Sequence, residues 1–186
     1  MGGINCRPGR GHIVMPDSVS ENLRLSYAEV VGNVFNYIKC FSSANAEIEQ
    51  LMMKEKMGKN FSELDSCLDE SIDEFNRAIV CVNFACARIK SIELKLKELN
   101  NNDDDEFHYF DKMKNLLMSQ SELISSLASE YGNDNAYHEL SAGNLNVYIR
   151  NNCITTITEQ AVQGISDVLF LLKEYSISNK LSPLTK

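Results

Sequence analysis

Histidine and carboxylate side chains are the groups best suited to metal binding and acid–base chemistry, and their spacing here matches no common site. The three histidines are His12, His108 and His138, and none lies four residues from another or three residues after a glutamate. Di-metal sites in helical bundles need such Glu-x-x-His motifs together with further inward-facing carboxylates. We therefore predict no metal site, no cofactor and no catalytic residue of this type.

Cysteine could supply a nucleophile or a disulfide, and the sequence favours neither. The six cysteines, which include no C-x-x-C pair, are Cys6, Cys40, Cys67, Cys81, Cys86 and Cys153. Cys81 and Cys86 stand among apolar neighbours, a setting that raises the pKa of a thiol and makes it unreactive. Their even number would permit disulfides, but without a secretory signal we expect free thiols.

Two loop-like stretches could bind ions or phosphate, and both lack the required pattern. The stretch NNNDDDEF at 100–107 has neither the alternating ligands nor the central glycine of an EF-hand, so it is interpreted as a turn whose acidic end begins a helix. The GRG at 9–11 follows no strand and lacks the lysine of a P-loop. Since every catalytic template fails, we expect a protein that is not an enzyme.

The overall charge argues against nucleic acid as a partner. The 186 residues carry a formal charge of −8, whereas phosphate recognition requires clustered Lys and Arg. No apolar stretch is long enough for a transmembrane helix, and the N-terminus lacks the apolar region of a secretory signal. We expect an intracellular protein, cytoplasmic or nuclear.

The elements that would position any site are long helices. No proline occurs between Pro16 and Pro183, so nothing there forces a helix to break. A first helix is predicted from a capping box at Ser18 and Glu21 to Gly58, with a candidate kink at 42–47. A second, capped by Asn60 or Ser62, extends to residue 99, with acidic residues in its first half and basic residues in its second half. Two i,i+4 ion pairs are predicted in it, Asp73 with Arg77 and Glu93 with Lys97.

The third and last helical segments are less regular. A third helix reaches Gly132 and carries Gln120 in a core position of its apolar seam. Residues 136–176 are predicted to form one helix, or a short one followed by a long one, with Gly164 inside the pattern. Within this segment LNVYI (145–149) alternates like a strand, and the sequence leaves 136–153 undecided between helix and irregular structure.

The predicted fold is therefore all-α, an elongated antiparallel bundle of about four long amphipathic helices with coiled-coil-like seams. Short polar connections favour antiparallel neighbours. The bundle domain would span 17–176, between flexible tails at 1–16 and 177–186.

Apolar residues outside the predicted seams point to a protein partner. Residues 80–89, VCVNFACARI, are apolar on nearly all sides, which fits either the centre of the bundle or a second docking face. The residues proposed for partner contact are Val80, Phe84, Leu116, Phe170 and Leu171. We predict a helical adaptor, scaffold or complex subunit that binds protein partners or itself.

Residues 64–89 and 109–130 resemble small helical subunits of the Mediator transcription complex. The resemblance lies in hydrophobic register and a few Cys, Leu and acidic positions over about a quarter of the chain, and the final fifty residues have no counterpart. It implies a subunit of a multiprotein complex and identifies no family.

Three alternatives remain open from the sequence. One is a bundle that binds a small ligand or cofactor, with Asn83, Gln120 and Tyr148 as polar groups near the seams. Another is a viral or parasite protein that engages a host helix. The third is a peripheral membrane adaptor lipidated at Gly2 and Cys6, where Cys6 takes the place of the Ser or Thr usual in a myristoylation motif.

Overall fold

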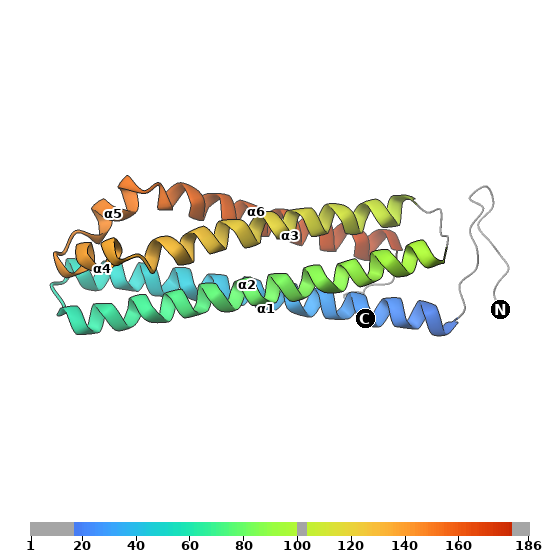
Figure 1. Ribbon diagram of the computed structural model, residues 1–186, viewed down its shortest axis with the longest axis horizontal. Coiled ribbons are helices and arrows are strands. Elements are labelled where there is room, and N and C mark those ends of the chain that lie inside the picture. Colours follow the sequence, from blue (N-terminus) through green and yellow to red (C-terminus); the bar gives the residue numbers. More distant parts are fainter. Residues whose placement is uncertain (1–16, 100–103, 180–186) are drawn as a thin grey trace.

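The described part of the chain is an elongated bundle of helices. The computed structural model describes residues 17–99 and 104–179, which form six helices and no strand. The helices are α1 (Asp17–Lys56), α2 (Phe61–Glu98), α3 (Asp104–Tyr131), α4 (Asp134–Ser141), α5 (Leu145–Asn151) and α6 (Ile154–Asn179). The predicted all-α fold is confirmed (Figure 1).

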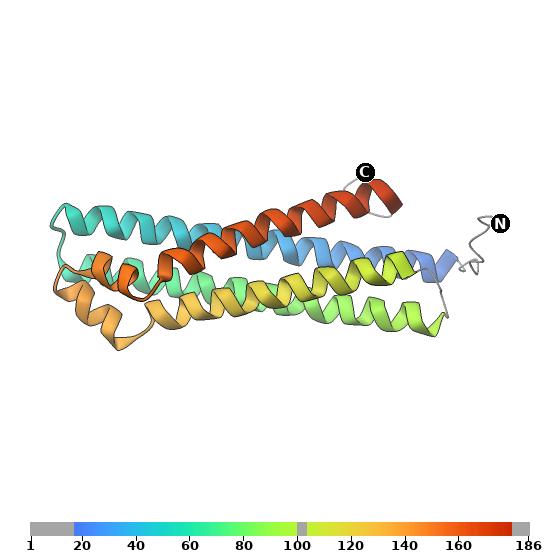
Figure 2. The same ribbon diagram turned by 90° about the horizontal axis from the view of Figure 1, so that it is seen from above.

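Four long helices run along the bundle and two short ones close one end. The most extensive packing is between α1 and α2, followed by that of α3 on α2 and then that of α6 on α3. α4 and α5 lie together at the end where α1 finishes and α2 begins, and they carry the chain from α3 into α6 (Figures 1 and 2). α6 ends at Asn179, so the helix extends beyond the predicted boundary at 176.

The turn between α1 and α2 follows the predicted chemistry. Gly58 has a φ of +74°, and the amide of Lys59 donates to the carbonyl of Lys54 at 3.1 Å. This is the bond that closes a helix end when glycine adopts the left-handed conformation. Of the two predicted caps for α2, Asn60 is the one used, since its Oδ1 accepts from the amide of Glu63 at 3.1 Å.

The predicted start of α1 was wrong. Ser18 does not precede the helix but lies within it, and Glu21 pairs with Arg24 at 2.6 Å. The helix is continuous through residues 42–47, the stretch of the candidate kink. Ala44 there is fully buried, and its carbonyl accepts from the Ser71 hydroxyl of α2 at 3.2 Å, so small residues bring the two helices close together.

The segment before α6 contains two short helices where one or none was predicted. Gly143, with a φ of +76°, ends α4, and LNVYI forms the start of α5 and not a strand. Leu145, Tyr148 and Ile149 are buried, which is the i, i+3, i+4 pattern of a helix face. A helix satisfies its own backbone hydrogen bonds, whereas the described chain offers no second strand to pair with.

A hydrogen-bonded glutamine lies in the core, as predicted. Gln120 of α3 is 1% exposed, and its Nε2 donates to the Tyr37 hydroxyl at 3.2 Å and to the Ala161 carbonyl at 2.9 Å. These bonds connect α3 with α1 and α6. Burial raises the pKa of Tyr37 to about 12, although the bond from Gln120 opposes this, so the phenol stays protonated at neutral pH.

The predicted i,i+4 ion pairs are replaced by other contacts. Arg77 pairs with Glu74. Glu93 is buried and accepts from Lys114 of α3 at 2.6 Å, while Lys97 lies 5.4 Å from the ring centre of Phe107. The i,i+4 prediction failed because a neighbouring helix supplies a closer partner for Glu93 than its own helix does.

Candidate functional site

The outer face of α2 carries an exposed apolar stripe. Val80 is 50% exposed, and Phe84 and Leu94 are each 61% exposed. Together with exposed Ala87 and Ser91 they form the set that we call the α2 stripe: Val80, Phe84, Ala87, Ser91 and Leu94. The successive spacings of four and three residues place all five side chains on one side of the helix.

The stripe exists because α2 uses its opposite face for the core. The residues of its second half that are buried against neighbouring helices are Val82, Ala85, Ile89, Ile92, Glu93 and Leu96. The stripe is offset from them by about half a turn, so α2 is apolar on two sides. Of the two interpretations of residues 80–89 offered by the sequence, the exposure of Val80 and Phe84 favours a second apolar face.

Basic side chains border this stripe. Between residues 77 and 97, α2 carries five Lys or Arg and a single acidic residue, Glu93, whose carboxylate is buried against Lys114. Toward α1, Arg88 reaches Glu29 at 3.3 Å, and both side chains remain about half exposed. Toward α3, Lys97 lies over Phe107. The stripe is thus a locally basic surface on an acidic protein.

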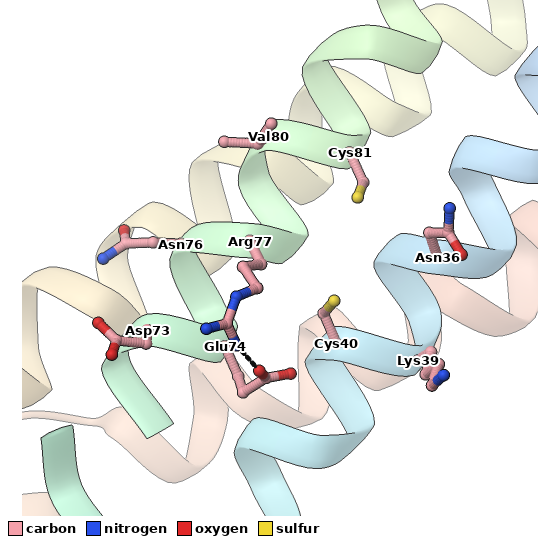
Figure 3. Close-up of a pocket in the computed structure, with 9 residues that line it drawn as sticks. All are labelled: Asn36, Lys39, Cys40, Asp73, Glu74, Asn76, Arg77, Val80 and Cys81. Carbon is pink, nitrogen blue, oxygen red and sulfur yellow. Dashed lines mark hydrogen bonds and ion pairs between the residues drawn. The ribbon is translucent and has the colours of Figure 1, made fainter. Parts of the chain in front are cut away.

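A groove between α1 and α2 adjoins the stripe at Val80. Its volume is about 800 Å³, and Figure 3 shows its lining, which comprises Asn36, Lys39 and Cys40 from α1 and Asp73, Glu74, Asn76, Arg77, Val80 and Cys81 from α2. The thiols of Cys40 and Cys81 point into the space between the two helices, while Arg77 bends back to Glu74 (Figure 3). Four of the nine lining residues are charged.

The groove thiols are poorly suited to nucleophilic chemistry. Burial raises the pKa of Cys40, and the neighbouring Cys81 adds to the effect. Burial also raises the pKa of Cys81, which outweighs the opposing influence of the Cys40 side chain. Both thiols therefore stay protonated at neutral pH, and the lining includes no histidine that could act as a base. Within residues 17–99 and 104–179, no group of three or more His, Cys, Asp or Glu is arranged to hold a metal ion.

The structure separates the predicted partner-contact residues. Val80 and Phe84 lie together on the α2 stripe, whereas Phe170 is 61% exposed on α6, and Leu116 is half-buried against the core. Leu171 is only 4% exposed, so its placement outside the seam was wrong. α6 buries both Leu171 and Leu172 because its apolar face is wider than a single heptad position. Leu94 was missed, although its spacing of fourteen residues, two heptads, from Val80 could have identified it.

The polar groups considered for a ligand site are engaged within the protein. Gln120 bonds to Tyr37 and Ala161, Tyr148 donates to the Glu130 carbonyl at 3.0 Å, and Asn83 accepts from Ser121 at 3.4 Å. They come from three different helices, and none lines the α1–α2 groove.

Gly2 and Cys6, the predicted lipidation residues, lie outside the described part of the chain, as does the predicted tail at 1–16. Among the described helices, none is both long and apolar enough to span a bilayer.

Comparison of the chain with protein-family models, curated proteins and solved structures gives no match. The resemblance to Mediator subunits gains no support from these comparisons.

Proposed function

We propose that this chain is a non-enzymatic helical interaction module, an adaptor, scaffold or complex subunit that binds a protein partner through the α2 stripe. The observation that carries the proposal is the exposure of three large apolar side chains, Val80, Phe84 and Leu94, at 50–61% in heptad spacing. Burying one such side chain contributes about 1.5–3 kcal/mol, so an uncovered row of them favours association. The proposal places the module inside the cell, in line with its free thiols.

The test compares two triple variants that remove similar apolar groups from different helices. The first, V80S/F84S/L94S, alters the α2 stripe. The matched control, V162S/L169S/F170S, alters α6, where the three side chains are 48%, 39% and 61% exposed. Both sets are exposed, so we expect both variants to fold, which circular dichroism would verify.

The measurement is chemical cross-linking with mass spectrometry on the full chain in extract of its native cells. We expect cross-links from Lys90, Lys95 and Lys97 to a partner protein, lost in the α2 variant and retained in the α6 variant. A complex that survives the α2 changes, or no cross-linked partner for the unaltered chain, would refute the proposal.

The small-ligand alternative is not favoured. The α1–α2 groove has a volume of about 800 Å³, within the range of about 300–1,000 Å³ for ligand sites, but it opens to solvent and four of its nine lining residues are charged. The membrane-adaptor alternative depends on Gly2 and Cys6, and nothing in the described residues bears on it.

A further inference from the structure

Resting on the proposed interaction function, we infer that the element seated on the α2 stripe is an amphipathic helix of another protein, whose apolar seam is flanked by acidic side chains. Three features of the molecule support this partner: the shape of the stripe, the charge at its borders and the poor fit of a second copy.

The stripe has the shape of a helix-docking seam. From Val80 to Leu94 the spacings are four, three, four and three residues, which is the repeat that a second helix follows in a knobs-into-holes contact. Its centre is small, with Ala87 and Ser91, and the larger side chains of Phe84 and Leu94 lie on either side of this centre. A partner backbone can therefore approach closely at the centre while its own apolar side chains pack beside Phe84 and Leu94. The stripe is about 21 Å long at 1.5 Å per residue, which corresponds to roughly four turns of a partner helix.

The borders of the stripe select for acidic flanks. Arg88 and Lys95 lie on the side toward α1, and Lys90 and Lys97 lie on the other side. Helices that pair through an apolar seam choose partners by the charges beside it, and like charges there oppose binding. Two of these basic residues form ion pairs within the protein. Glu29 pairs with Arg88 at 3.3 Å and Glu98 pairs with Lys95 at 3.5 Å, and both pairs are exposed. Lys90 is exposed and pairs with no carboxylate of the described residues.

A second copy of this chain fits the stripe poorly. A two-fold axis through Ala87 would place Val80 opposite Leu94, but it would also bring Arg88 close to Arg88 of the second copy and set Lys90 against Phe84. An axis shifted toward Val82 would set the acidic half of α2 against its basic half. That register, however, would place Leu94 beside Glu70 and Ala87 beside Arg77. Neither arrangement satisfies the apolar seam and the charges together.

The test uses the full chain and two labelled synthetic helices of about three heptads with identical Leu/Ile seams. One peptide carries Glu at the flanking positions and the other carries Lys, and binding is followed by fluorescence anisotropy. We expect the acidic peptide to bind at least about tenfold more tightly than the basic one, and to weaken as salt is raised from about 0.05 to 0.3 M.

Two charge variants locate the effect. R88Q/K90Q/K95Q removes three positive charges beside the stripe, and K112Q/R150Q/K173Q removes three exposed positive charges elsewhere. We expect the first to weaken binding of the acidic peptide about tenfold and the second to change it less than about twofold. V80S/F84S/L94S should abolish binding, while V162S/L169S/F170S should leave it intact.

Several outcomes would overturn the inference. They are equal or tighter binding of the basic peptide, equal weakening by both charge variants, and a concentration-dependent dimer, seen by light scattering, that V80S/F84S/L94S dissociates. If the acidic peptide fails while the cross-linked native complex still depends on the α2 stripe, the partner chemistry is wrong and the proposed function stands. If the native complex does not depend on the α2 stripe, the proposed function itself fails.

Discussion

At the scale of single residues, the contact between Gln120 and Gly164 explains a glycine that helix propensity alone makes unfavourable. A Cβ added at Gly164 would lie 1.9 Å from Oε1 of Gln120 and 2.4 Å from its amide carbon. Gln120 cannot move away freely, because its Nε2 holds the bonds to Tyr37 and Ala161. The lack of a side chain at Gly164 thus leaves room for the buried amide of Gln120, and a change at either residue affects the other.

We predict that Gly164→Ala destabilises the protein by about 1–3 kcal/mol, the cost of breaking buried hydrogen bonds. Urea unfolding measures the change. In a Gln120→Ala background, the same Gly164→Ala substitution should cost little or become stabilising, because the clashing atoms are gone and alanine favours helix.

Gly32 is the matched control for this prediction. It also lies inside a long helix, but a Cβ there meets nothing within 4 Å. Gly32→Ala should therefore stabilise the protein by roughly 0.5–1 kcal/mol. Equal effects at Gly32 and Gly164 would show that the contact with Gln120 carries no energy.

The thiols should differ widely in reactivity. In a Cys6→Ser chain at neutral pH, we expect N-ethylmaleimide to label exposed Cys153 first, with Cys67 protected until unfolding. Burial raises the pKa of Cys40 and Cys86, so these two should react slowly and speed up by about tenfold per pH unit below their pKa. Mass spectrometry of the labelled peptides reads out the order, and Cys153→Ser should remove the fast phase. Labelling of Cys40 at the rate of Cys153 at neutral pH would contradict the burial argument.

At the scale of helices, the first residues of α2 and α5 show how local chemistry sets boundaries. Asn60 caps α2 through its side chain, whereas Asn144, which precedes α5, makes no side-chain capping bond. The same residue type thus has two different roles in the same kind of position, and the difference depends on backbone conformation and not on sequence.

We predict that Asn60→Ala destabilises the protein by about 1 kcal/mol, because the Glu63 amide loses its acceptor. Asn144→Ala is the control and should change the free energy of unfolding by less than about 0.5 kcal/mol. Thermal or urea unfolding measures both. Comparable losses for the two variants would mean that the Asn60 bond does not contribute to stability.

The long helices could be predicted from sequence, and the short ones could not. Apolar spacing together with Gly58, Asn60 and Gly132 placed α1, α2 and α3 closely, since each signal acts within one turn of the residue that carries it. α5 was ambiguous because the apolar residues of LNVYI fit both the two-residue period of a strand and the 3.6-residue period of a helix over only five residues. Its helical state is decided by burial of Leu145 and Tyr148 against the bundle. The partner of Glu93 was equally beyond sequence, because Lys114 reaches it from another helix.

At the scale of the whole molecule, the candidate site was half predictable. Val80 and Phe84 stood out because they are apolar and lie outside the seam of their own helix. Leu94 continues their row, and Leu171 is buried although Phe170 beside it is exposed. Both outcomes depend on how far the neighbouring helices cover α2 and α6. The width of a buried face is set by packing between helices, and a single sequence does not specify it.

The order of packing predicts how the molecule opens. α2 lies between α1 and α3, whereas α6 packs mainly on α3 and contains Gly164. α4 and α5 are short, and the junction before α6 holds Cys153 at a φ of +56°, a conformation unfavourable for a residue other than glycine. Helices with fewer packed neighbours open at lower free energy than the global transition.

We therefore expect amide hydrogen exchange to be slowest in the middle of α2, faster in α6 and fastest in α4 and α5. Mass spectrometry of peptic fragments would measure this under conditions where the protein remains folded. Gly164→Ala should speed exchange in α6 more than in α2, because the lost bonds are those that connect α3 to α6 and to α1, while Gly32→Ala should leave the difference unchanged. Uniform protection of α2 and α6 would mean that the bundle opens only as one cooperative unit, and that its helices are bound more equally than their packing indicates.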